Sequence, residues 1–315
     1  MTEAHLSPAH SDGHPETVRG THVVIQRNPL SGSGRKNHQL LILVRRLRQD
    51  GLTVRMFSNR ERMDQYLADH SGRHQIRCLV AAGGDGTVAN LVSRHPELPI
   101  AVFPLGTENL LAGYLKVPTC GETVAEMIRE GKTRVFDTGF VGNQRFLIMV
   151  SAGVDANVVR QLHSNRQGHI SRLTYLRPII SSFFRYRFPV LAVRRADGTL
   201  IGAGTHVIVS NLPAYGFEMP FSPEADPHDG LLNIRILKSG GWLRTVVHAI
   251  RMRLRIFPSE QNVLRATAGE ITITCDVPGI PVQFDGDPAA DCPARIRIAP
   301  QSMTLIVRST KTPSQ

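Results

Sequence analysis

The stretch Ala81-Ala82-Gly83-Gly84-Asp85-Gly86-Thr87 decides the fold, because it joins an apolar run at Arg77–Ala82 to a helical pattern at Thr87–Ser93. Its three glycines let backbone N–H groups approach a bound group closely, and a helix N-terminus directly behind them favours a phosphate. The Gly-Lys-Ser/Thr of a Walker A loop does not follow at the required spacing. The simpler explanation is a tight strand-to-helix turn in which Asp85 or Thr87 caps the helix. The stretch therefore indicates an α/β fold and leaves phosphate binding open.

Two further small-residue turns follow other predicted strands. They are Asn28-Pro29-Leu30-Ser31-Gly32-Ser33-Gly34, after the strand at His22–Gln26, and Pro104-Leu105-Gly106-Thr107-Glu108-Asn109, after the strand at Ile100–Pro104. In a parallel sheet all three turns lie along the carboxyl edge, where ligands bind. The simpler explanation must account for each turn separately. We therefore predict a nucleotide cleft at this edge.

Strand and helix patterns alternate from His22 to about Arg134, which predicts a parallel sheet covered by helices. Beyond Arg134, short apolar runs separated by Gly, Pro and Asp predict an antiparallel β region with two or three helices. The predicted strands there include Phe146–Ser151, Ile296–Ile298 and Met303–Val307. The expected organisation is a disordered tail at 1–20, a nucleotide-binding domain at 21–134, a β-rich acceptor-binding domain at 135–310 and a tail at 311–315.

The composition restricts the class of protein. The 315 residues include 37 Lys+Arg and 26 Asp+Glu, a net charge of +11, and 41% are hydrophobic. The hydrophobic content excludes a disordered chain, and the basic excess predicts attraction to polyanions such as nucleotides, nucleic acid or an anionic membrane. No apolar run approaches the ~20 residues of a membrane span, and the amino terminus lacks the apolar region of a signal peptide. We expect a cytoplasmic protein that meets membranes, if at all, at their surface.

Taken together, the motifs resemble those of the soluble diacylglycerol kinase and sphingosine kinase superfamily, which has distant relatives among the NAD kinases. The resemblance spans about Val23 to Val307 and is carried by NPLSGSG at 28–34, GGDGT at 83–87, PLGTEN at 104–109, EADPHDGLL at 224–232 and FDGD at 284–287. It implies a Rossmann-like nucleotide-binding domain of the NAD kinase and diacylglycerol kinase type, followed by an antiparallel β-sandwich that binds the lipid. ATP and the acceptor hydroxyl would meet in the cleft between them.

The resemblance also implies which positions hold ATP and the catalytic Mg²⁺. Phosphoryl transfer depends on positioning and charge neutralisation, so Asp85, on its glycine turn, suits an indirect role in holding Mg²⁺. Asp64 matches a further family aspartate of the metal–water network. The implied nucleotide contacts are Asn28, Ser31, Gly32, Ser58, Gly83, Gly84, Gly86, Thr87, Gly106, Thr107 and Asn109.

Asp287 matches the carboxylate that the family uses as general base on the lipid hydroxyl, which makes Asp85 and Asp287 the predicted catalytic pair. The family usually has glutamate here, and aspartate is one methylene shorter, which matters for reach. The alternative is an ordinary turn aspartate in a hairpin. Leu110 is a second departure, because the family commonly has aspartate there and a leucine side chain cannot coordinate a metal.

Asp226, Asp229 and the carbonyl of Leu231 match a structural Mg²⁺ site of the bacterial members, where hard oxygen ligands fold round one ion. The alternative is a solvated acidic turn before the strand that starts at Leu231. With Glu224 beside it, this acidic cluster stands out in a basic chain. We therefore favour the metal site.

Two segments are candidates for membrane contact. In Gly241–Phe257, one helical stripe is apolar and the opposite one is basic, with Trp242 at the start. The apolar stripe consists of Leu243, Val246, Val247, Ile250 and Leu254, and the basic stripe of Arg244, His248, Arg251 and Arg255. The usual explanation, which we prefer, is a core helix with a solvated face. In Arg172–Arg187, aromatic side chains and arginines would line the acceptor cavity and meet anionic lipid.

The sequence thus predicts an ATP- and Mg²⁺-dependent lipid kinase that phosphorylates a hydroxyl of a diacylglycerol-like or sphingoid-like lipid. One alternative is a kinase of a soluble substrate such as NAD. Another is a nucleotide-binding regulatory protein of weak catalysis, motivated by Leu110 and Asp287. Net charge alone favours nucleic-acid binding, so we expect no nucleic-acid partner. Related soluble kinases often form homodimers, which is the basis for expecting one here.

Overall fold

The computed structural model describes residues 18–29, 31, 36–69, 75–164, 186–213, 221–238, 240–253 and 262–308. Gly32, most of the two predicted tails and the arginine-rich segment up to Arg185 lie outside this part of the chain. Among the helices that are described, none combines the length and the apolar character needed to cross a membrane.

The amino-terminal part alternates strands and helices. Its strands are β1 (His22–Arg27), β2 (Thr53–Phe57), β3 (Ile76–Gly83) and β4 (Ile100–Pro104). Its helices are α1 (Asn37–Gln49), α2 (Arg60–Asp69), α3 (Asp85–Arg94), α4 (Leu110–Tyr114) and α5 (Gly121–Glu130). The strands are parallel and lie in the order β2-β1-β3-β4. Seven of the eight β3 residues are buried, as an apolar run covered on both faces of a parallel sheet should be.

The carboxyl-terminal part is mainly antiparallel. Its strands are β5 (Thr133–Val141), β6 (Gln144–Phe146), β7 (Met149–Ala152), β8 (Leu191–Arg195), β9 (Leu200–Gly204), β10 (His206–Ser210), β11 (Leu232–Leu237), β12 (Val263–Ala268), β13 (Glu270–Cys275), β14 (Val282–Phe284), β15 (Asp287–Pro288) and β16 (Ala294–Ile306). Two helices, α6 (Val154–Ser164) and α8 (Trp242–Arg253), accompany them. Strands β12-β11-β10-β7-β14-β15 form one sheet, and a second apolar core fills the space between it and the β8, β13 and β16 region.

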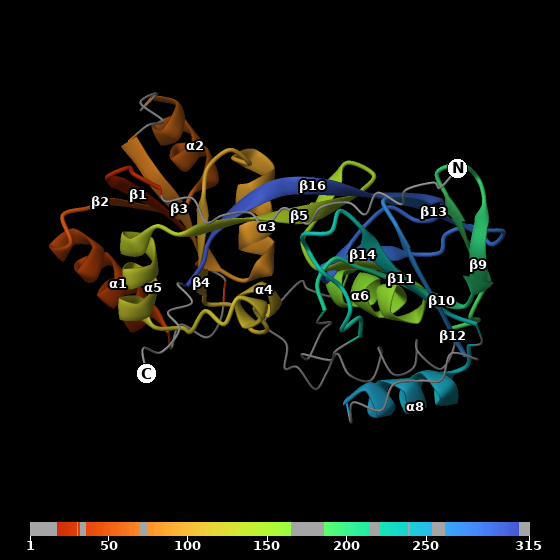
Figure 1. Ribbon diagram of the computed structural model, residues 1–315. Coiled ribbons are helices and arrows are strands. Elements are labelled where there is room, and N and C mark those ends of the chain that lie inside the picture. Colours follow the sequence, from red (N-terminus) through yellow and green to blue (C-terminus); the bar gives the residue numbers. More distant parts are fainter. Residues whose placement is uncertain are drawn as a thin grey trace, which may run out of the picture.

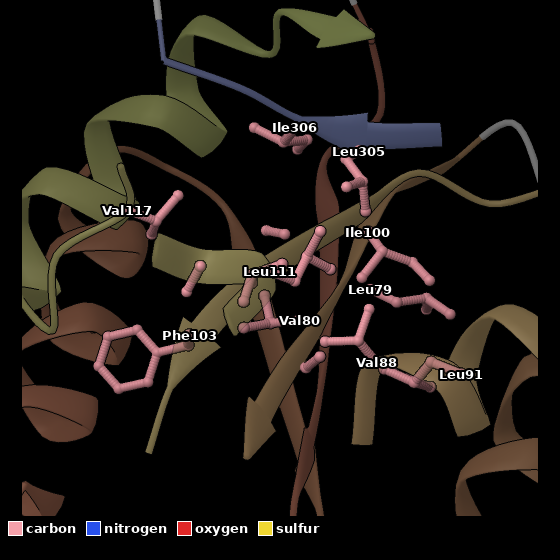
Figure 2. Close-up of a cluster of buried hydrophobic side chains, with 14 of the residues drawn as sticks. Leu79, Val80, Val88, Leu91, Ile100, Phe103, Leu111, Val117, Leu305 and Ile306 are labelled. Atoms are coloured by element: carbon pink, nitrogen blue, oxygen red, sulfur yellow. The ribbon is translucent and has the colours of Figure 1, made fainter. Parts of the chain in front are cut away.

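The last strand, β16, joins the two parts. It pairs with β4 in parallel at Leu305 and with β5 and β13 in antiparallel fashion, so the parallel sheet continues as β4-β16-β13-β8-β9. Figure 1 shows β16 as a long strand that crosses from one part to the other. In Figure 2, Leu305 lies beside Ile100, and both belong with Leu79 and Ile306 to the amino-terminal core. The end of the described chain therefore completes the core that its beginning starts.

The predicted fold class, an α/β domain followed by an antiparallel β region, is confirmed. Three of the predicted strands differ in detail. The predicted strand at Phe146–Ser151 is broken, because the N–H groups of Leu147, Ile148 and Met149 donate to a distant carboxylate. The strands predicted at Ile296–Ile298 and Met303–Val307 are one strand, β16, with a shift of register between Ala299 and Met303.

Candidate active site

The three predicted turns lie together at the carboxyl edge of the parallel sheet, because their strands are neighbours. The N–H of Asn28 donates to the carbonyl of Ala82 (3.0 Å), which ties the first turn to the second. The N–H groups of Leu105 and Gly106 donate to the carbonyl of Gly83 (2.9 and 3.2 Å), which ties the third turn to the second. The edge is therefore a continuous surface of small-residue backbone.

Glycine is required where the second and third turns meet. A Cβ atom on Gly106 would lie 2.7 Å from the Cα of Gly84, and one on Gly83 would lie 2.1 Å from the Oγ1 of Thr87. Helix α3 begins at this point without a side-chain cap, so its positive end is directed at the same surface. Backbone this closely packed, in front of a helix N-terminus, suits a phosphate group.

Asp85 connects two of the turns through its side chain. Its Oδ2 accepts a hydrogen bond from the N–H of Leu110 (2.9 Å) and its Oδ1 from that of Leu111 (3.1 Å), so the carboxylate caps α4. Burial raises the pKa of Asp85, and the two backbone hydrogen bonds oppose this effect. Leu110, whose side chain departs from the family pattern, thus contributes its backbone N–H here and its side chain to the core.

The third turn contains a polar side chain directed inward, Asn109, and an exposed one, Thr107. Asn109 has a left-handed backbone (φ 52°), and its Nδ2 donates to the carbonyl of Gly106 (2.8 Å). Its Oδ1 is buried and accepts no hydrogen bond from the described residues. Thr107 is exposed, whereas Thr87 is buried. A buried amide oxygen without a donor is costly, so a bound hydroxyl or N–H group would stabilise it.

The remaining predicted nucleotide contacts lie at the outer part of the same edge. Asn28 follows β1 and is half-buried, and the N–H of Ser31 donates to the carbonyl of Asn28 (3.2 Å) in a turn. Ser58 is exposed directly after β2, the outermost strand. Gly32 cannot be placed.

The β14–β15 hairpin carries a second aspartate, Asp285, beside the one that the sequence favoured. Asp285 is half-buried, and its carboxylate accepts hydrogen bonds from the N–H groups of Leu147 (2.6 Å), Ile148 (2.9 Å) and Met149 (2.9 Å). Burial raises the pKa of Asp285 to about 7, against these three hydrogen bonds, and the charge of Asp85 raises it further. Leu147, Ile148 and Met149, which donate to Asp285, belong to the apolar core of the amino-terminal part, so the hairpin is tied to that part of the molecule.

Asp287 lies on the other strand of the same hairpin, paired with Phe284. Its side chain is 52% exposed, and its Oδ1 lies 3.2 Å from the Nε2 of His163 at the end of α6. Sequence reasoning assigned a role to Asp287 and none to Asp285 or His163. The motif gave a signal for Asp285, since two aspartates flank Gly286, but nothing near His163 in the sequence pointed to it.

The acidic loop before β11, which contains Asp226 and Asp229, is held in place by a carboxylate of another strand. Asp137, buried in β5, accepts hydrogen bonds from the N–H groups of Gly230 (2.8 Å) and Gln301 (2.7 Å), and so fastens this loop to β16. Burial raises the pKa of Asp229, and the neighbouring charges of Asp226 and Asp137 add to this. Sequence reasoning missed Asp137; the available signal was a carboxylate inside an apolar strand.

The predicted Mg²⁺ ligands in this loop fit a hard cation by donor type. They are two carboxylates and the carbonyl of Leu231, and a cation would offset the burial and the neighbouring negative charges that raise the pKa of Asp229. Within the described residues, no three His, Cys, Asp or Glu side chains converge on one metal position. Glu224 is directed elsewhere, because its carboxylate binds the buried guanidinium of Arg235 (2.6 and 2.7 Å).

Asp64 lies at the opposite end of α3 from Asp85. Its Oδ1 accepts hydrogen bonds from Arg94 and from the Nε2 of His95 (2.8 Å). Burial would raise the pKa of Asp64, but the hydrogen bonds from Arg94 and His95 outweigh it and lower the pKa. The structure therefore joins Asp64 to the end of α3 and does not bring it to the GGDGT turn.

Comparisons with known proteins agree with this arrangement. The model of the diacylglycerol kinase catalytic domain matches residues 22–141, and that of the YegS C-terminal NAD kinase beta sandwich-like domain matches residues 148–307. A diacylglycerol kinase of Mycobacterium tuberculosis is 26% identical over 302 residues, covering 89% of this chain and 93% of that protein. A probable lipid kinase YegS-like of Serratia proteamaculans is 22% identical over 284 residues, covering 87% and 91%.

Solved structures show the same fold. A crystal structure of a putative diacylglycerol kinase from Bacillus anthracis covers 91% of this chain and 97% of that chain with a TM-score of 0.70 at 20% identity. Yeast NADH kinase complexed with NADH covers 93% and 84% with a TM-score of 0.51 at 11% identity. Since the two matched family models follow one another along nearly the whole described chain, this protein belongs to the soluble lipid kinase superfamily of the diacylglycerol kinase and YegS type.

Proposed function

We propose that this lipid kinase transfers the γ-phosphate of ATP to a hydroxyl group of a diacylglycerol-like or sphingoid-like lipid. The observation that carries the proposal is the junction at Asp85. There, the carboxylate of the GGDGT turn caps the helix after the PLGTEN turn, and its charge also raises the pKa of Asp285 in the hairpin. The relative named diacylglycerol kinase supports a diacylglycerol-like acceptor. We keep the predicted division, with ATP held by residues 21–134 and the acceptor by 135–310.

On the nucleotide side, we assign the phosphates to the backbone of Gly83, Gly84 and Gly86 and the N-terminus of α3. The buried Oδ1 of Asn109 would accept a hydrogen bond from a ribose hydroxyl or an amino group of the nucleotide. Thr107 and Ser58, both exposed at this edge, would donate from their hydroxyls. These contacts are neutral, so they position ATP without adding charge.

Two groups of residues would hold Mg²⁺. Each oxygen of Asp85 already accepts one backbone hydrogen bond, which leaves a second lone pair for a metal-bound water. Asp226, Asp229 and the carbonyl of Leu231 would hold a structural ion. When bound, Mg²⁺ neutralises part of the phosphate charge during transfer.

On the acceptor side, we propose that Asp287 takes the proton of the lipid hydroxyl. Its carboxylate is exposed, and the His163 imidazole lies against it. The imidazole would fix the orientation of the shorter side chain that replaces the usual glutamate. In this assignment Asp287 is the catalytic residue and His163 is a positioning residue.

The test is a labelling assay with Mg²⁺ and γ-labelled ATP. The acceptors are diacylglycerol, monoacylglycerol, ceramide and sphingosine in mixed micelles, together with soluble NAD. The variants are Asp85→Asn and Asp287→Asn, with Asp291→Asn as a matched control, because Asp291 is an exposed aspartate of the same region paired with Arg160 (2.9 Å).

Label in one lipid, lost in the first two variants and kept in the control, is the expected result and names the acceptor class. Label in NAD alone would show that the protein phosphorylates a soluble substrate and not a lipid. ATP binding without any labelled acceptor would favour the regulatory alternative and overturn the proposal.

A further inference from the structure

Helix α8 exposes an apolar stripe. Trp242 is 45% exposed, Leu243 58%, Val247 41% and Ile250 54%. At 100° per residue, Leu243, Val247 and Ile250 fall within about 60° of one another on the helix surface. The expectation that the stripe is buried in a core is therefore wrong for these three side chains. Leu254, the fifth predicted member, lies outside the described residues.

The exposed apolar side chains of α8 lie together on one face of one helix, unlike the other exposed apolar residues. Elsewhere in the described chain, large exposed apolar side chains stand singly on different elements, such as Leu41 on α1, Leu200 on β9 and Val277 in a turn. None of the described helices and strands packs extensively against α8. Figure 1 shows α8 at the margin of the β-rich part, outside the two sheets. A contiguous apolar face of this kind indicates a surface that binds something.

The charge on α8 indicates which kind of partner. The helix sequence, WLRTVVHAIRMR, contains no acidic residue, and Arg244 and Arg251 are exposed on the border of the stripe. The whole chain carries a net charge of +11. A line of apolar residues with arginines beside it matches the interface of an anionic bilayer. There, the apolar side chains enter the boundary of the acyl chains, and the guanidinium groups bind the phosphates of the headgroups.

We propose that α8 binds the surface of an anionic membrane through Leu243, Val247 and Ile250, with Arg244 and Arg251 on the headgroups. This inference rests on the proposed function, since a lipid acceptor resides in a membrane. It names the surface by which the kinase would reach that acceptor. Trp242, at the start of the helix, has the amphipathic ring that prefers the interfacial layer.

The experiment compares vesicles of phosphatidylcholine with vesicles of phosphatidylcholine and phosphatidylglycerol by sedimentation. The stripe variant is Leu243→Ser/Val247→Ser/Ile250→Ser. Its matched control, Leu41→Ser/Leu200→Ser/Val277→Ser, removes three equally exposed apolar side chains from other elements. We expect the stripe variant to lose about tenfold or more in affinity for the anionic vesicles and the control to keep it. Arg244→Gln/Arg251→Gln should remove the preference for phosphatidylglycerol.

Circular dichroism and thermal unfolding establish that the stripe variant is folded. If the folded stripe variant binds anionic vesicles as the wild type does, the inference is wrong. It is also wrong if the variant changes from dimer to monomer in sedimentation equilibrium while vesicle affinity is unchanged, because the stripe would then join two copies of this chain.

An activity assay separates this inference from the proposed function. A short-chain, water-dispersed diacylglycerol can be phosphorylated without membrane binding, whereas a long-chain diacylglycerol in vesicles cannot. We expect the stripe variant to keep activity on the first and lose it on the second. If the wild type phosphorylates neither, the proposed function fails, and the sedimentation result still decides whether α8 binds membranes.

Discussion

At the scale of single residues, Asp285 makes the stability of this protein depend on pH. Its pKa is raised from 3.8 to about 7 by burial. The folded protein therefore holds this proton more tightly than the unfolded chain does. The contribution of Asp285 to the free energy of unfolding is greatest at acidic pH and falls as the pH rises from about 4 to about 7.

We expect Asp285→Asn to remove this dependence. Between about pH 8 and about pH 5, the wild type should gain roughly 2–3 kcal/mol relative to the variant, measured by urea unfolding. The variant should also be less stable overall, by about 1–3 kcal/mol, because an amide N–H₂ would face a backbone N–H. Parallel curves of stability against pH would contradict a raised pKa at this position.

The proposal that Asp287 is the general base can also be tested at a single residue. Asp287→Asn should lower kcat by about 100-fold or more while leaving the KM for ATP nearly unchanged, because the group acts on the acceptor. Asp287→Glu restores the usual family side chain and should keep substantial activity. His163→Gln, which removes the neighbouring imidazole, should shift the pH profile of kcat. Full activity of Asp287→Asn would exclude Asp287 as the base.

At the scale of elements, the contact between the second and third turns is testable by adding one methyl group. Gly106→Ala places a Cβ 2.7 Å from the Cα of Gly84, which is backbone and cannot rotate away. We expect a loss of about 1–3 kcal/mol in stability and weaker binding of ATP, measured by calorimetry. In Gly113→Ala, on α4, the new methyl meets nothing within 4 Å. This control should be neutral or slightly stabilising. Equal changes in stability and ATP binding in Gly106→Ala and Gly113→Ala would refute a close contact between the second and third turns.

The elements that sequence reasoning predicted are those whose signals are local. Strands β1, β3 and β4 are apolar runs that end in small-residue turns, and a turn bounded in this way is visible in the sequence. The break between β6 and β7 was not predictable, because it depends on Asp285, more than a hundred residues later. The exposure of α8 was not predictable either, since an apolar stripe has the same spacing whether it is buried or not.

The same distinction holds for the site. That the three turns share one edge followed from strand order, which alternating patterns indicate. The pairing of His163 with Asp287 and the anchoring of the acidic loop by Asp137 arise from tertiary packing. The spacing of residues along the sequence does not predict such contacts.

At the scale of the whole molecule, β16 makes the two parts depend on each other. Leu305 is fully buried and pairs with Ile100 of β4 (Figure 2). We expect Leu305→Ala to cost about 2–5 kcal/mol. Hydrogen exchange should show loss of protection in β3 and β4 and also in β5 and β13, because β16 pairs with β4, β5 and β13. The exposed Leu200→Ala should change stability by no more than about 0.5 kcal/mol. Loss confined to the strands β1 to β4 would show that the two parts unfold separately.

The position of β16 also bears on how the protein is made. During synthesis, β1 to β4 leave the ribosome long before Leu305 and Ile306 are translated, so the amino-terminal core cannot be completed until β16 has been made. Domains usually fold in order as they emerge, but this one would hold an unpaired β4 edge until synthesis is nearly complete. During most of its synthesis, the nascent chain can thus form non-native strand pairs at the edge of β4. A chaperone that covers β4 would act during translation rather than after it.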